Sequence, residues 1–131
     1  MDSRPIKERE KDGLKTRGEV LGKTWVDKSQ ANVDDFNREF TEFLHTTCWN
    51  DIWNRPGLSR KMRSILNLGM LTALGKEHEL KLHIRGALNN GVTRDEIKEI
   101  FMQAAIYAGV PAAVDSFRIA REVFAQGPGK A

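Results

Sequence analysis

Residues 77–110 read EHELKLHIRGALNNGVTRDEIKEIFMQAAIYAGV and contain two helices with clear end and start signals. Apolar residues recur here at spacings of three and four, which is the periodicity of an amphipathic helix. The first helix is predicted to end at Asn89-Asn90-Gly91, because asparagine and glycine tolerate the left-handed backbone of a helix exit. Thr93 and Glu96 then form a capping box, which starts a second helix that Gly109 ends.

The same helical periodicity extends along the rest of the chain, and no stretch shows the sustained alternation of a strand. We expect an all-α fold of about six helices in one compact domain over residues 1–131, with 1–13 and 126–131 peripheral or frayed. Helices are predicted at about 7–21, from a cap at Asn32 or Asp34 through Leu44, as a short turn at 48–53, from the N-cap Ser59 to about Leu74, at 77–90, from Thr93 through Tyr107, and at 112–125.

Two of these segments are expected to supply much of the core. One is the stripe formed by Phe36, Phe40, Phe43 and Leu44. The other is the helix after Ser59, which carries many apolar side chains and is expected to be the most buried. The helices offer more Ala, Gly and Leu surface than one small bundle usually hides, so we also expect a homo-oligomer.

Composition excludes several classes of protein. The 21 Lys and Arg against 18 Asp and Glu give a net charge of only +3, which argues against a nucleic-acid binder. Apolar stretches are far shorter than the roughly 18 to 20 residues that cross a bilayer, and the first residues contain no apolar signal segment. We therefore expect a cytoplasmic protein without membrane contact. Cys48 is the single cysteine, so dithiol chemistry within one chain is excluded.

One face of the helix at 77–90 carries groups that could do chemistry. Glu79, His83 and Asn90 lie on one stripe, with the small residues Gly86 and Ala87 between the last two. Glu79 lies one turn before His83 and could accept a hydrogen bond from the imidazole, which would raise the pKa of the ring. Such a pair suits general acid or base catalysis, although an ordinary surface pair has the same spacing. No metal site is expected, because His78 and His83 face different directions.

A second feature is a cluster of cations around the start of the helix after Ser59. The cluster consists of Arg55, Arg60, Lys61 and Arg63. Cations are disfavoured in a first helical turn, so the free backbone donors and guanidinium groups predict a carboxylate or phosphate site. A solvated basic patch is the alternative. Trp49 and Trp53 lie just before this cluster and share a helix face, as core or subunit contacts would.

Several short sequence motifs together resemble those of the carboxymuconolactone decarboxylases, a family of the all-α alkylhydroperoxidase-D-like superfamily. The resemblance covers about residues 14–124. It is carried by WNDIW at 49–53, RPGL at 55–58, RSIL at 63–66, ELKLHIRGALNNGVT at 79–93 and AIYAGVPA at 105–112. The resemblance implies a homo-trimer or hexamer that needs no cofactor. It also implies decarboxylation of 4-carboxymuconolactone, a dicarboxylate lactone, to 3-oxoadipate enol-lactone and CO2 in the beta-ketoadipate pathway of protocatechuate catabolism.

The resemblance also implies roles for individual residues. In the peroxidase branch of the superfamily a CxxC motif precedes a histidine, and here His83 matches the histidine while Glu79 and Lys76 replace the cysteines. His83 and Glu79 are therefore the expected catalytic pair, and Cys48 is outside the motif. The expected substrate-binding residues are Arg60 or Arg63 for the retained carboxylate, Arg85 or Asn90 at the lactone carbonyl, Trp49 or Trp53 beside the departing carboxylate, and Tyr107.

Two other functions stay open from the sequence alone. A thiol-dependent or peroxide-linked member of the same superfamily would share the fold, although the missing CxxC argues against it. A non-enzymatic helical oligomer acting as an adaptor would share the composition, but it would leave the Glu79, His83 and Arg63 groups unexplained.

Overall fold

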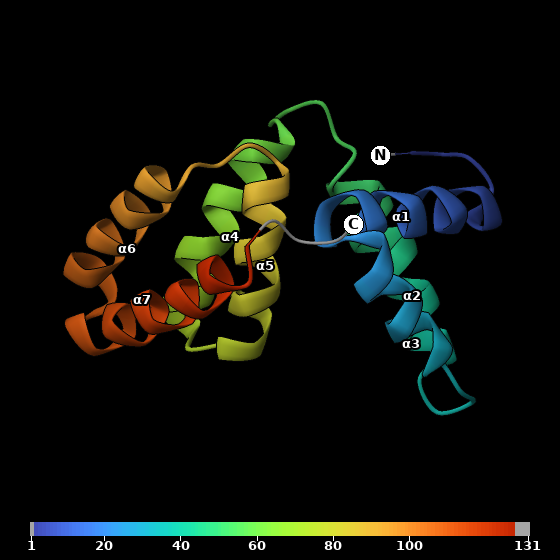
Figure 1. Cartoon of the computed structure of the whole chain (residues 1–131). Coiled ribbons are helices and arrows are strands. Elements are labelled where there is room, and N and C mark those ends of the chain that lie inside the picture. The colour runs from blue at the N-terminus through green and yellow to red at the C-terminus, as the bar shows by residue number, and fades with distance from the viewer. Residues whose placement is uncertain (1, 128–131) are drawn as a thin grey trace. The chain divides into compact units, whose positions relative to one another are not determined.

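A computed structural model describes residues 2–127, and these residues form seven α-helices and one π-helix without a strand. The chain divides after Leu58 into two compact units, which we call the N-terminal unit and the C-terminal unit. Figure 1 colours the N-terminal unit from blue to green and the C-terminal unit from green to red. The all-α prediction is confirmed. Each unit is described by itself below.

The N-terminal unit is built from α1 (Ile6–Leu21), α2 (Lys23–Ala31), α3 (Arg38–Phe43) and the π-helix η1 (Leu44–Ile52). Gly22 alone joins α1 to α2, with a φ of 99° that glycine adopts at little cost. Helix α1 packs directly on η1. Two side-chain contacts tie these helices together, because Arg9 Nη1 lies 2.8 Å from Asp51 Oδ2 and Thr16 Oγ1 donates to Asn54 Oδ1 over 3.0 Å.

The C-terminal unit contains α4 (Arg60–Leu74), α5 (Glu77–Asn89), α6 (Arg94–Ala108) and α7 (Val110–Ala125). Its boundaries follow the local signals. Ser59 caps α4 by accepting from the Met62 backbone N–H over 3.1 Å, and Gly75 ends it with a φ of 69°. The capping box of Thr93 and Glu96 is present at the start of α6. These predicted ends are confirmed.

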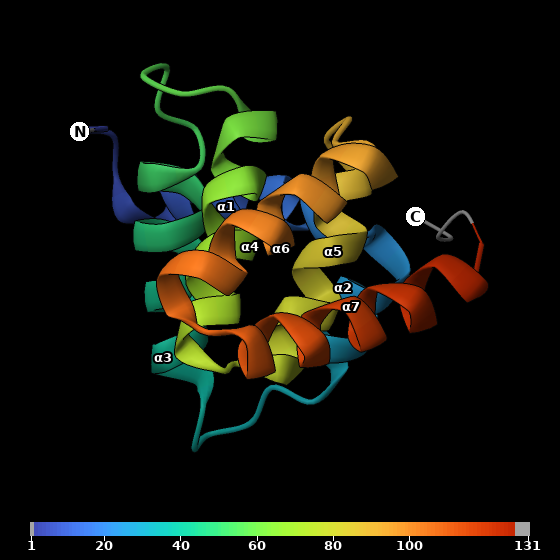
Figure 2. The ribbon, with the colours of Figure 1, turned by 90° about the vertical axis from the view of Figure 1, so that its left-hand side faces the viewer.

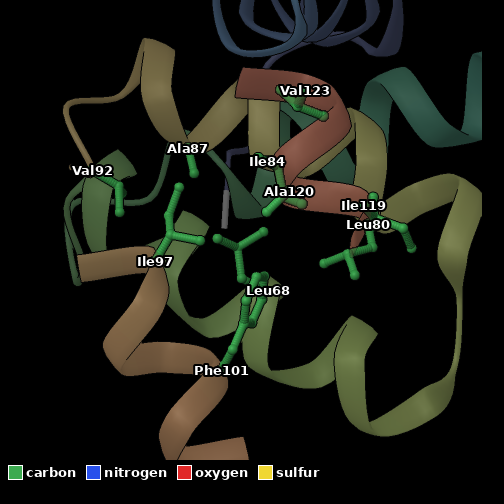
Figure 3. Packing of buried hydrophobic residues seen from close by; sticks show 10 residues of the cluster. All are labelled: Leu68, Leu80, Ile84, Ala87, Val92, Ile97, Phe101, Ile119, Ala120 and Val123. Carbon is green, nitrogen blue, oxygen red and sulfur yellow. The ribbon is translucent and has the colours of Figure 1, made fainter. Parts of the chain in front are cut away.

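Ten buried side chains form the core of the C-terminal unit, and Figure 3 shows them converging from all four helices and the turn after α5. They are Leu68, Leu80, Ile84, Ala87, Val92, Ile97, Phe101, Ile119, Ala120 and Val123. Helix α5 contributes three of them and packs against both α4 and α7, and Figure 2 shows α7 crossing in front of α5. The orientation of α5 about its axis is therefore determined by burial on this face.

The predicted phenylalanine stripe is wrong as a core element. Phe36 is 98% exposed, and Phe40 and Phe43 are each about 60% exposed. The reason is local, because Asp34 caps a turn instead of a helix and its Oδ1 accepts from the backbone N–H groups of Phe36 and Asn37. Helix α3 begins only at Arg38, so Phe36 precedes it and no stripe forms.

The expectation that α4 is the most buried helix is also wrong. Met62, Leu66, Met70 and Leu74 recur every fourth residue and are 48%, 49%, 50% and 68% exposed. The buried positions of α4 are instead Ser64, Leu68 and Thr72. Periodicity identifies an apolar face, but it does not reveal whether the same chain covers that face.

Other boundaries differ from the predictions in informative ways. Helix α2 was not predicted, because its sequence KTWVDKSQA is mostly polar and Val26 is its one buried residue. The short turn expected at 48–53 belongs mostly to the nine-residue π-helix η1. The tail predicted to fray begins at Gln126, and its last four residues, 128–131, are outside the described part. No helix in the described range is long and apolar enough to cross a bilayer.

Candidate active site

Helix α5 places His83 beside the core of the C-terminal unit. Leu80, Ile84 and Ala87 are fully or almost fully buried, and His83 adjoins them on the helix surface with its Nδ1 atom buried. Burial lowers the pKa of His83 to about 4, from an ordinary value near 6.5, because the charged ring loses hydration. The imidazole is therefore neutral at pH 7, with one N–H donor and one acceptor nitrogen.

Glu79 does not act on His83 in the way the spacing predicted. Its side chain is exposed in the first turn of α5, and within residues 2–127 it forms no hydrogen bond or ion pair. A carboxylate that is solvated by water has little influence on a neighbouring ring. The predicted rise in the pKa of His83 is therefore wrong in sign, since burial dominates.

Arg60 and Arg63 lie in the first turn of α4, three residues apart and both partly buried. They share this end of the helix with the backbone donors that follow the Ser59 cap, an arrangement that suits an anion. The other two cations of the predicted cluster differ. Lys61 Nζ pairs with Glu96 Oε2 at 3.1 Å, and Arg55 is exposed and belongs to the N-terminal unit.

Asn90 joins the end of α5 to the first turns of α4. Its Nδ2 donates to Ser64 Oγ over 3.0 Å, and Ser64 follows Arg63 directly. The structure therefore brings Asn90 to the turn that carries the predicted arginines. His83 lies two helical turns before Asn90 on the same helix, so the imidazole and the arginines belong to one pair of packed helices.

Arg85 and Tyr107 are placed elsewhere in the C-terminal unit. Arg85 Nη2 donates to the backbone oxygens of Val123 at 3.1 Å and Gly127 at 2.7 Å, so its guanidinium caps the end of α7. Positions 83 and 85 are about 200° apart around a helix, which separates their side chains. Tyr107 is 82% exposed near the end of α6. The described contacts bring neither residue to His83.

Trp49 and Trp53 form a stacked pair in the N-terminal unit. Both are buried, and their ring centroids are 5.2 Å apart with an interplanar angle of 16°. They lie on η1 and at its end, where the wider turn of a π-helix changes the usual offset between residues four apart. The sequence predicted their shared face, and the stacking gives that face a rigid aromatic surface.

A second histidine is buried in the N-terminal unit. His45 is 2% exposed inside η1, and its Nε2 lies 3.1 Å from Arg17 Nη1. Burial, with a smaller contribution from the Arg17 charge, lowers the pKa of His45 to about 4. Arg17 also donates to Ser29 Oγ and lies 5.2 Å from the Trp25 ring centroid. No local pattern connects residues 28 positions apart.

Cys48 and possible metal ligands add no reactive group to this description. Burial raises the pKa of the Cys48 thiol, which disfavours the thiolate that nucleophilic chemistry needs. Within residues 2–127, no three His, Cys, Asp or Glu side chains are grouped closely enough to hold a metal ion.

The structure thus defines an all-α protein in which two packed helices carry the candidate groups, arginines at the start of α4 and on α5 an imidazole whose Nδ1 atom is buried. Comparison with known proteins gives the class a name: the model of the carboxymuconolactone decarboxylase family matches residues 38–122, and the chain belongs to this family. It is 45% identical to a 4-carboxymuconolactone decarboxylase from Acinetobacter baylyi over 89% of this chain and 87% of the relative. A nitrosuccinic acid decarboxylase from Metarhizium robertsii is 40% identical over 85% of this chain and 78% of that protein.

Proposed function

We propose that the protein decarboxylates 4-carboxymuconolactone, giving 3-oxoadipate enol-lactone and CO2. The observation that carries this proposal is the 45% identity with a decarboxylase of that substrate over nearly the whole length of both chains. The arginines on α4 and the neutral imidazole on α5 support it, because the substrate is a dianion whose reaction develops an oxyanion.

The lactone can serve as its own electron sink. When the carboxylate leaves as CO2, the electron pair of the broken bond moves through the ring double bond to the lactone carbonyl, which becomes a dienolate. A proton then returns to the ring carbon next to that carbonyl. The protein must hold the dianion, stabilise the oxyanion and allow this protonation, so no prosthetic group is required by the chemistry.

The lowered pKa of His83 favours a role as a hydrogen-bond donor to the oxyanion over a role as the proton donor. An imidazole with a pKa of about 4 is almost entirely neutral at pH 7, so it is a poor store of an acidic proton. Its N–H remains a hydrogen-bond donor, and a neutral donor in a poorly hydrated site stabilises a developing oxyanion effectively. We therefore assign His83 to the lactone oxygen.

The arginines are assigned to the carboxylate that stays on the product. Tight binding of the departing carboxylate would stabilise the ground state and slow its loss, so Arg60 or Arg63 is better used on the carboxymethyl arm. Asn90, which is held at the same turn of α4 by Ser64, is the neighbouring polar group. The roles expected for Glu79 beside the ring, and for Trp49 and Trp53 beside the departing group, stay predictions from the sequence.

The test is lactone turnover, followed by ultraviolet absorbance and CO2 release. His83→Ala is expected to lower kcat by about 100 to 1,000-fold, as the loss of one oxyanion donor does in other enzymes. His78→Ala is the matched control, since His78 is exposed on the same helix. Wild-type turnover in a folded His83→Ala variant would remove His83 from the mechanism. Peroxide consumption that disappears in Cys48→Ser would favour a thiol-dependent function instead.

Decarboxylation of nitrosuccinic acid is a second candidate, favoured by the 40% identity with a decarboxylase of that acid. Its nitro group can accept the electron pair as the lactone carbonyl does, and it is also a dicarboxylate. Turnover of both acids by the same preparation decides between them, since the preferred substrate is the one with the higher kcat/KM.

We also propose that the protein assembles as a homo-trimer or hexamer. The proposal is supported by the exposed apolar stripe of α4 and by Met102 and Ile106 on α6, which are 56% and 79% exposed. Light scattering after size-exclusion chromatography measures the mass directly. Leu66→Glu, in the middle of the stripe, is expected to lower that mass, and a monomeric wild-type protein would contradict the proposal.

A further inference from the structure

The C-terminal unit contains a cavity that the proposed active site does not use. It has a volume of about 420 Å³ and lies between α6 and α7. None of the residues assigned to the lactone lines it. Its size is within the range of about 300 to 1,000 Å³ that is typical of small-molecule sites.

Three phenylalanines line this cavity, together with the aliphatic side chains of Ile97, Ala120 and Ala125. Phe101 is fully buried, and Phe117 meets it edge-on with 5.4 Å between ring centroids and an interplanar angle of 78°. Phe124 lines the cavity from the last turns of α7. A flat apolar body could therefore pack against ring faces and edges here, as aromatic groups do in protein cores.

The remaining polar lining is entirely cationic. Arg94, Lys98 and Arg121 line the cavity, and no acidic side chain does. The Arg94 guanidinium lies 4.6 Å from the Phe124 ring centroid, and Lys98 has only a long 3.9 Å ion pair with the exposed Asp95. Within residues 2–127, neither Arg94 nor Arg121 forms an ion pair. Three cations around an apolar hollow repel one another, and an anion would relieve this repulsion.

Arg118 shows how an ordinary surface arginine of the same helix behaves. It lies three residues before Arg121, outside the cavity, and it forms ion pairs with Glu77 at 3.4 Å and Glu122 at 3.3 Å. Arg94 and Arg121 are thus distinguished from Arg118 because neither forms an ion pair within residues 2–127, and Lys98 has only its long contact with Asp95.

We propose that this cavity binds an organic carboxylate with a planar apolar body, an aromatic monocarboxylate being the simplest example. The ring of the ligand would pack against the phenylalanines, and its carboxylate would pair with Arg121 and with Arg94 or Lys98. An inorganic anion would make no contact with the phenylalanine rings, and a neutral aromatic compound would leave the cations without an anionic partner. Both parts of the ligand are therefore needed for binding.

The experiment titrates the full-length protein with sodium benzoate, using isothermal calorimetry and protein-observed NMR. Benzamide has the same shape without charge, and acetate has the charge without the ring. Each is expected to bind at least about tenfold more weakly than benzoate, since each loses one of the two contributions. Chemical-shift changes are expected on α6 and α7.

Two matched variants separate the cavity from general electrostatics. Arg121→Gln is expected to weaken benzoate binding about tenfold or more, whereas Arg118→Gln removes the same charge and is expected to leave it unchanged. Near-ultraviolet circular dichroism checks that both variants keep the native fold. Equal effects of the two substitutions, or no measurable benzoate binding, would overturn the proposal.

A third variant tests whether benzoate instead occupies the proposed lactone site. Arg63→Gln alters that site and is expected to leave benzoate affinity unchanged. If Arg63→Gln weakens binding and Arg121→Gln does not, the cavity between α6 and α7 is not the benzoate site. These readouts measure binding and not turnover, so their failure is distinguishable from failure of the decarboxylase assignment.

Discussion

Gly13 is the position where one added methyl group should disturb the N-terminal unit most. Helix α1 crosses η1 so closely that a Cβ at Gly13 would lie 2.6 Å from the carbonyl carbon of His45 and closer still to its oxygen. The obstacle is backbone and cannot rotate away as a side-chain end could. Gly13→Ala therefore requires α1 and η1 to separate.

The expected magnitude follows from two opposing contributions. Alanine is better than glycine inside a helix by about 1 kcal/mol. Overpacking costs typically about 1 to 3 kcal/mol, and a clash with backbone belongs at or above the upper end. We therefore expect Gly13→Ala to lower the free energy of unfolding by about 2 kcal/mol or more, which for a chain of this size lowers Tm by roughly 5 to 10 °C.

Gly18→Ala is the matched control on the same helix. A Cβ there would lie 3.9 Å from Lys23 Cα, an ordinary contact, so the helix propensity of alanine should raise stability by up to about 1 kcal/mol. Thermal and urea unfolding, followed by circular dichroism, compare both variants with the wild type. If Gly13→Ala were as stable as Gly18→Ala, the close packing of α1 on η1 would be refuted.

Three further predictions concern pH and helix ends. The pKa values of His83 and His45 are both about 4 in the folded protein, below the unfolded value, so the unfolded state binds more protons at acid pH. The contribution of these histidines to the free energy of unfolding is therefore fully present above about pH 6.5. It falls as the pH drops toward 4, by up to about 3 kcal/mol per histidine. Urea midpoints that do not differ between pH 7 and pH 4.5 would contradict this prediction. Thr93→Ala removes one half of the capping box and should cost about 1 kcal/mol in urea unfolding, whereas the exposed substitution Lys98→Ala should cost less than about 0.5 kcal/mol. Arg85→Met should speed amide exchange in the last turn of α7, because the carbonyl of Val123 loses its charged donor. Unchanged exchange would show that Arg85 does not stabilise the end of α7.

The parts of the fold that could be predicted are those determined by neighbouring residues. The Ser59 cap, the left-handed Gly75 and the Thr93 capping box each satisfy backbone groups within a few positions, so the sequence contains the whole interaction. The prediction of a buried stripe beginning at Phe36 was wrong because a turn capped by Asp34 interrupts the helical periodicity there. The prediction that α4 is the most buried helix was wrong because the apolar face of a helix does not reveal what covers it.

For the candidate site too, the sequence predicted relations between neighbouring residues but not the effects of tertiary packing. The spacing placed Glu79 and His83 one turn apart on a helix, but the pKa of His83 depends on how much water the packed helices remove, which spacing does not contain. The contacts of Arg85 lie about 40 residues away, at the end of α7. His45 and Arg17 likewise meet only through the packing of α1 on η1.

The clamp formed by Arg85 has a practical consequence for anyone who engineers this chain. The guanidinium donates hydrogen bonds to the carbonyls of Val123 and Gly127, and Arg85 lies only two residues after His83. A truncation or fusion junction placed before Gly127 would therefore loosen the helix that carries the imidazole. Affinity tags and reporters are better attached beyond that glycine, where the anchor of α5 is left intact.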